Sequence, residues 1–171
     1  TLSNNIIGGW AIINGTDFAS YLPGTGIGAL NQTGFANYNA TSFPAAPGNA
    51  AQNIKVSNNS FAVPTTSGAG IYSLNSLAHA ANAADQSITF TTGTNTLNLT
   101  SGGFLKSGNF NGTIGASVNS GNISAGVGAG VKELFVTNNQ GTLTVNSAIV
   151  DNAGGGNTRL VLSGPSGGAF V

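Results

Sequence analysis

The stretch TNTLNLTSGGFLKSGN, residues 94–109, decides the fold. Leu97 and Leu99 alternate with polar residues, which is the two-residue period of a β-strand that buries one face. Glycine-containing turn signals follow at 101–103 and 107–109. A short apolar strand between tight glycine turns is the repeating unit of a stacked β-structure.

The same unit recurs along the chain, and helix signals are weak. The alanine-rich segment 76–85 lacks a sustained 3.6-residue apolar face, so we interpret it as a loop or a single helical turn. A β-sandwich also has short strands, but it usually carries more charge and fewer glycine-rich corners. The pattern therefore favours an all-β parallel β-helix, or β-solenoid. Further strand segments lie at 87–90, 133–136, 141–145 and 159–162, and further turns at 111–112, 120–122, 154–156 and 164–165.

The chain is almost uncharged. Charged residues make up 5% of it, against about 25% in a typical soluble domain, and the four cationic and four acidic side chains cancel. Nucleic-acid binding needs several cations to replace counterions, so it is not expected. No apolar run reaches the roughly 20 residues of a membrane helix, which argues against membrane insertion. Cysteine is absent, which excludes disulfides, and the absence of methionine predicts a processed product or a piece of a longer chain.

One domain is expected over residues 1–171. Residues 1–70 hold most of the aromatic side chains and four of the five prolines, so we predict loop-rich first coils there. Residues 71–171 are predicted to form the regular coils. No charge run or low-complexity linker separates the two parts.

Several short segments follow one another in a telling order along the chain. They are IGGWA (7–11), NGTDFA (14–19), SLNSL (73–77), LNLTSGGFLKSG (97–108), TI (113–114), SGNIS (120–124), KELFV (132–136), LTVNSAIVDN (143–152) and RLVLSGP (159–165). Their order resembles the passenger region of bacterial autotransporter-associated β-strand repeat proteins, and the resemblance covers most of the chain outside about 22–66. It implies a right-handed parallel β-helix within a large secreted or surface-displayed protein, with no catalytic residues and no cofactor.

The two ends of the chain suggest self-assembly. When the tail, Phe170 and Val171, is written before the head, Thr1, Leu2 and Ser3, the result is one uninterrupted alternating strand. Solenoids without polar caps expose unpaired strand edges that pair with further chains. Our hypothesis is that copies stack end to end into a homo-oligomer or filament, or that the chain is one segment of a longer solenoid.

No catalytic, cofactor-binding or metal-binding residues are predicted. The acids Asp17, Asp85, Glu133 and Asp151 are isolated in the sequence and are interpreted as caps, turn residues or solvated strand ends. The only histidine, His79, is interpreted as an exposed loop residue. With so few charges, backbone hydrogen bonds between coils are expected to hold the fold, which predicts stability that is insensitive to pH and salt.

The function expected from the sequence is that of a non-enzymatic extracellular structural protein: a rigid surface or adhesin module, or a filament subunit. One alternative is a carbohydrate-binding or carbohydrate-active β-helix, in which Trp10, Tyr21 and Tyr38 stack on surface glycans; the same aromatics could instead fill the core. A third possibility is an ice- or surface-binding solenoid, which needs a flat face of the Thr-x-Thr pairs.

Overall fold

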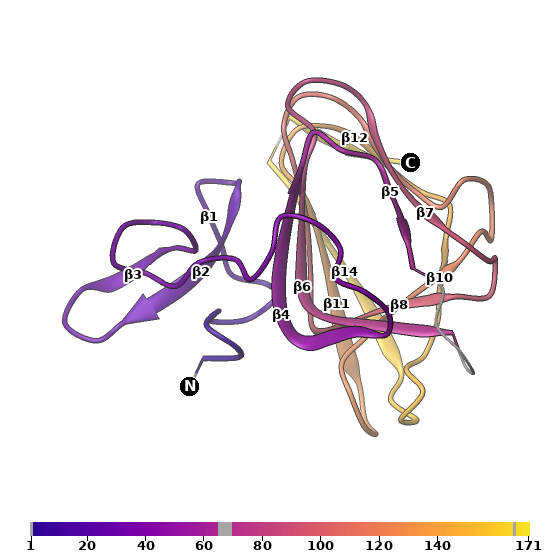
Figure 1. The fold of residues 1–171 in the computed structure, drawn as a ribbon, viewed down its shortest axis with the longest axis horizontal. Coiled ribbons are helices and arrows are strands. Elements are labelled where there is room, and N and C mark those ends of the chain that lie inside the picture. Colours follow the sequence, from indigo (N-terminus) through magenta and orange to yellow (C-terminus); the bar gives the residue numbers. More distant parts are fainter. Residues whose placement is uncertain (1, 65–69, 166) are drawn as a thin grey trace.

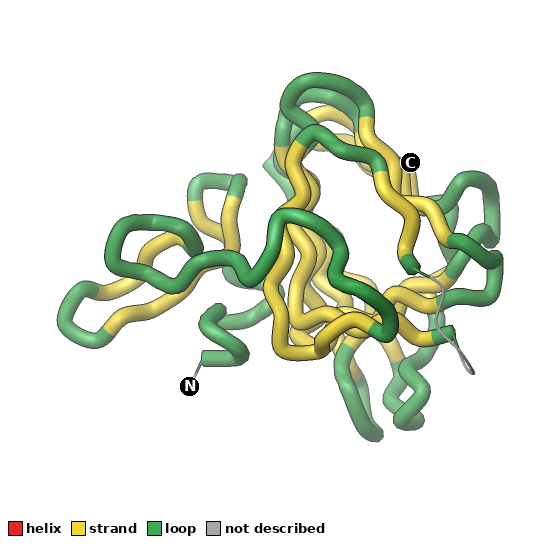
Figure 2. Tube along the Cα trace, in the orientation of Figure 1, coloured by secondary structure: helices red, strands yellow, loops and turns green. Residues whose placement is uncertain are grey.

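The structure, a computed structural model, describes residues 2–64, 70–165 and 167–171, and these residues form strands and loops but no helix (Figure 2). Parallel strands stack into a β-solenoid of about four turns, as the sequence predicts. In Figure 1 the coils lie behind one another, and the N-terminal segment projects to one side.

Three long strands bend around a corner and form two faces of the solenoid. These are β4 (Gly48–Ser57), β6 (Ile71–Ala80) and β8 (Thr96–Ser107). They pair in parallel, with a register shift at the corner. Four shorter strands continue the stack on these faces: β10 (Asn122–Ala125), β11 (Lys132–Asn138), β13 (Ala148–Ile149) and β14 (Thr158–Ser163).

The remaining face is a separate parallel sheet in the order β15-β12-β9-β7-β5. Each of its strands follows a strand of the larger sheet after a short turn, so every coil contributes once to each face. Its members are β5 (Phe61–Val63), β7 (Gln86–Phe90), β9 (Gly112–Ile114), β12 (Gly141–Val145) and β15 (Gly168–Phe170).

Coil length is nearly constant, but one corner is widened by an inserted loop that recurs in the following coil. Thr96 pairs with Asn122, and Asn122 pairs with Ala148, so these two successive coils are equal in length. The coil that runs from Gly103 to its partner Phe135 is longer. The extra residues form the loop between β10 and β11.

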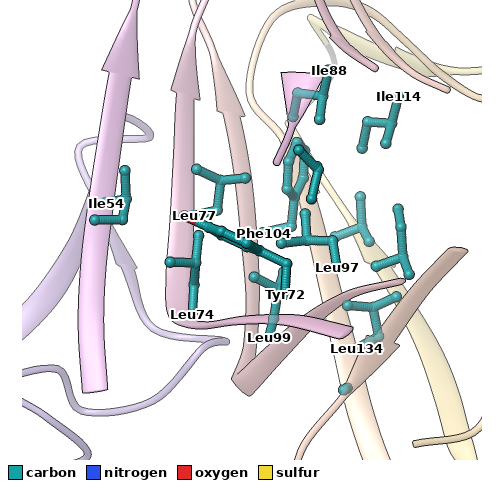
Figure 3. Close-up of a cluster of buried hydrophobic side chains, with 14 of the residues drawn as sticks. Ile54, Tyr72, Leu74, Leu77, Ile88, Leu97, Leu99, Phe104, Ile114 and Leu134 are labelled. Atoms are coloured by element: carbon teal, nitrogen blue, oxygen red, sulfur yellow. The ribbon is translucent and has the colours of Figure 1, made fainter. Parts of the chain in front are cut away.

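Inward side chains of successive coils lie above one another and fill the lumen. On the face made by β4, β6, β8, β11 and β14, one column runs from Ile54 through Leu77, Phe104 and Val136 to Leu162. Figure 3 labels its first three members, Ile54, Leu77 and Phe104. Its first four members are buried. Because strand side chains alternate between faces, one apolar residue in two is enough to build this column.

The N-terminal residues form a small antiparallel sheet outside the solenoid, made of β1 (Ile12–Ile13), β2 (Asp17–Leu22) and β3 (Gly26–Ala29). Phe18 of this sheet packs with Ala78 and Leu105, which point outward from β6 and β8. Lys55, in the same outward column, is 2.6 Å from Asp17.

Two segments differ in structure from what the sequence predicts. The loop-rich first coils expected over 1–70 begin only near β4, because residues 12–29 pair antiparallel with one another instead of stacking on the next coil. The segment 76–85, interpreted as a loop or helical turn, begins as strand: β6 extends to Ala80. Outward Ala78 is covered by the N-terminal sheet, so both faces of β6 are buried and its sequence does not alternate.

Candidate functional site: the open last coil

The first coil of the solenoid is covered by the chain itself. Residue Ala40 bridges Ile54 in parallel, and the following segment crosses the first coil (Figure 1). Phe43 in this segment stacks on Phe61, with 4.2 Å between ring centroids, and on Tyr72, with 5.4 Å. This end of the lumen therefore has an aromatic cap.

The last coil has no such cover among the described residues. Leu162, the last member of the inward column, is 50% exposed, and Val171 is 78% exposed. Together with Ile149, Leu160 and Phe170 these side chains line a cavity of about 350 Å³ that leads to buried Val136 and Ile114. The outer edge of β14 pairs with no described strand. An apolar lumen and an unpaired parallel edge are thus exposed at the same place.

The residues at the head of the chain do not form the continuous tail-to-head strand that the sequence predicts. Thr1 lies outside the described residues. Ser3 forms an antiparallel bridge with Ile6, and its hydroxyl donates to Asn75 Oδ1 at 3.4 Å. Leu2 is partly exposed in the same segment. The head of the chain therefore lies against the corner of β6 and does not stack on the first coil.

Inside the lumen, a short column of polar side chains lies beside the apolar column. His79, Lys106 and Asn138 occupy paired inward positions on successive coils, and none of the three is exposed to solvent. The Lys106 ammonium donates to the carbonyl oxygens of Gly108, at 2.7 Å, Phe110 and Gln140. It thus ties the corner of its own coil to that of the next.

His79 is therefore not the exposed loop residue expected from the sequence. Its ring lies edge-on to Phe61, with 5.5 Å between centroids, and neither ring nitrogen has a hydrogen-bond partner. Burial lowers the pKa of His79 to about 4, and the nearby Lys106 charge acts in the same direction. Burial likewise lowers the pKa of Lys106. No signal in the sequence marks this column, since its members look like ordinary solvated residues.

Each of the four acids binds a group of its own chain. Asp17 pairs with Lys55, Asp151 accepts from the Thr158 amide at 2.7 Å, and Glu133 contacts Arg159. Asp85 accepts from Asn111 through the amide and the side chain. Among residues 2–64, 70–165 and 167–171, no three His, Asp or Glu side chains gather in a way that could hold a metal ion.

The three aromatics proposed to stack on glycans lie in different surroundings. Tyr38 is buried in the cluster with Phe18, and its hydroxyl accepts from the Phe18 amide at 3.1 Å. Burial raises the pKa of Tyr38. Trp10 and Tyr21 are 61% and 47% exposed. The glycan-stacking interpretation thus stays a prediction only for the two exposed residues.

Comparisons with known proteins give no relative. No protein-family model, no curated protein and no solved structure matches the chain. The fold defines the class, a parallel β-solenoid, whereas membership of the autotransporter-associated family remains a resemblance. A search of the described part of the chain finds no helix of the length and hydropathy needed to cross a membrane.

Proposed function

We propose that the chain is a non-enzymatic structural module of an extracellular or cell-surface protein, and that it associates with a second copy through its last coil. The observation that carries the association is the exposed end of the lumen at Leu160, Leu162 and Val171. Patches of this kind mark interaction surfaces on soluble proteins. The extracellular location rests on the resemblance to the autotransporter-associated proteins.

The two ends of the solenoid suggest how copies would join. Because Phe43 covers the first coil, a head-to-tail filament would have to displace this cap. No described segment would have to be displaced for two last coils to meet. Such an interface places the same surface on both partners, which is the arrangement of a two-fold dimer. Aliphatic side chains would fill the two facing cavities, and charges do not line this cavity.

Sedimentation velocity over a concentration series tests the proposal. We expect a monomer–dimer equilibrium that Leu162→Lys abolishes, because two ammonium groups would be buried in one interface. Ile27→Lys is the matched control, since Ile27 is 64% exposed on the N-terminal sheet. A monomer at every concentration would refute the association. Long fibres with a regular repeat in electron micrographs would instead show that the first coil also joins, and would refute the two-fold arrangement.

A further inference from the structure

A groove on the outer surface, separate from the last-coil cavity, brings three charged side chains together in a chain that has few. It has a volume of about 390 Å³, within the range of small-ligand sites, and lies where β8 turns its corner beside β11. Its principal side chains are Thr100, Ser101, Lys132, Glu133, Phe135 and Arg159.

The register of the solenoid places these side chains together. Glu133 and Phe135 are two apart on β11 and point outward, while Leu134 between them points into the core. Arg159 is paired with Glu133 on the next coil, and its guanidinium contacts that carboxylate. In the sequence Glu133 and Arg159 look isolated, because one whole coil separates them.

The Phe135 ring lies beside bare backbone. Gly102, with φ +74°, faces it, and a Cβ on Gly102 would be 1.9 Å from the Glu133 carbonyl oxygen and 3.5 Å from the ring. Only glycine fits there. The Phe135 side chain is half-buried and lines the groove.

The charge of the groove is net positive in a chain that is neutral. Lys132 and Arg159 are two of the four cationic side chains, and Glu133 is the only acid in the lining. The Arg159 side chain is 65% exposed. Arg159 contacts Glu133 through Nη2, so the other N–H donors of its planar guanidinium remain for a ligand carboxylate.

We propose that this groove binds an oligosaccharide that contains uronic acids. The Phe135 ring offers an apolar surface to a sugar ring, Arg159 and Lys132 bind the sugar carboxylates, and Glu133 accepts from sugar hydroxyls. This binding goes beyond the structural role proposed above and does not depend on it, because the Leu162→Lys monomer keeps the groove intact.

Isothermal titration of the full chain with tetragalacturonate tests the inference. We expect measurable binding and a loss of affinity of about tenfold or more in Arg159→Gln, since a charge-assisted hydrogen bond is removed. Cellotetraose, a neutral probe that offers no carboxylate to the two cations, should bind at least about tenfold more weakly.

Two controls keep the result interpretable. Tyr21→Ala removes an exposed aromatic from the N-terminal sheet and should leave affinity unchanged. Phe135→Leu keeps an apolar side chain at the corner, so a loss of binding in a variant with an unchanged circular dichroism spectrum reports the ring itself. No binding of tetragalacturonate by the folded protein, equal binding of cellotetraose, or full affinity in Arg159→Gln would each overturn the proposal.

Discussion

Acidification should destabilise this protein through its single histidine. His79 is fully buried on β6 beside Phe61 and Lys106, and its pKa is lowered to about 4 in the folded state. In the unfolded chain the imidazole has its ordinary pKa of about 6.5. Between these values the unfolded state binds a proton that the native state does not, so the free energy of unfolding falls as the pH decreases.

The magnitude follows from the two pKa values. Each pKa unit corresponds to about 1.4 kcal/mol, so the loss is roughly 3 kcal/mol between pH 6.5 and pH 4. That is a large part of the about 5–15 kcal/mol that stabilises a typical domain. The structure thus predicts a pH dependence of stability that the sequence-based expectation, in which His79 is exposed, does not include.

Urea denaturation at a series of pH values, for the wild type and for His79→Leu, measures the effect. The difference between the two curves isolates the histidine from the carboxylates, which both proteins share. Because the chain has one histidine, the imidazole C–H signals in NMR spectra also report its titration directly. A constant difference between the two proteins from pH 7 to pH 4, or a histidine that titrates near 6.5 in the folded protein, would refute the reasoning.

Two further substitutions test the packing. Gly103→Ala should lower the free energy of unfolding by about 2 kcal/mol and loosen the N-terminal sheet, since the new Cβ would be 2.7 Å from Gly9 Cα and 2.8 Å from the Phe18 ring. Gly93→Ala, whose Cβ meets nothing within 4 Å, is the control. Equal stability of the two variants in urea denaturation would contradict this close contact. Lys106→Met should lower the free energy of unfolding by about 2–4 kcal/mol, because three carbonyl oxygens lose their shared ammonium donor. A Lys106→Met protein that is as stable as the wild type in thermal denaturation would show that the ammonium contributes nothing net.

The strands that carry one buried face could be predicted from the sequence. Leu97 and Leu99 alternate with polar neighbours and are buried as expected, and the same holds for Leu143 on β12. The outward Asn98 is itself buried, with its amide donating to the Gly126 carbonyl oxygen, and the outward Thr142 and Thr144 on β12 are half-buried. Because these outward residues are polar, the pattern of the sequence still records the direction of each side chain.

Prediction failed where a second layer covers the outside. Ala78 and Leu105 point away from the lumen, yet both are buried beneath the N-terminal sheet. Phe104 and Leu105 are therefore consecutive buried residues on one strand, and alternation is lost. No local pattern in β6 or β8 indicates that another segment, distant in the sequence, packs on them.

The candidate sites were less accessible to sequence reasoning than the fold. The polar column and the outer groove join residues separated by one coil, such as His79 with Lys106 and Glu133 with Arg159. Finding them requires the coil length, and the insertion between β10 and β11 makes that length differ from one coil to another.

That insertion shows where this architecture can vary. The loop 126–131 is matched one coil later by the loop 152–157, and the two glycine-rich loops touch: a Cβ on Gly154 would be 2.7 Å from the Gly128 amide nitrogen. Strands on both sides keep their pairing, so the added residues leave the lumen undisturbed. A peptide grafted at this corner would be displayed on the surface without a change of register. The internal stacking of the solenoid is thus constant, whereas the loops on its outer surface can be changed one coil at a time.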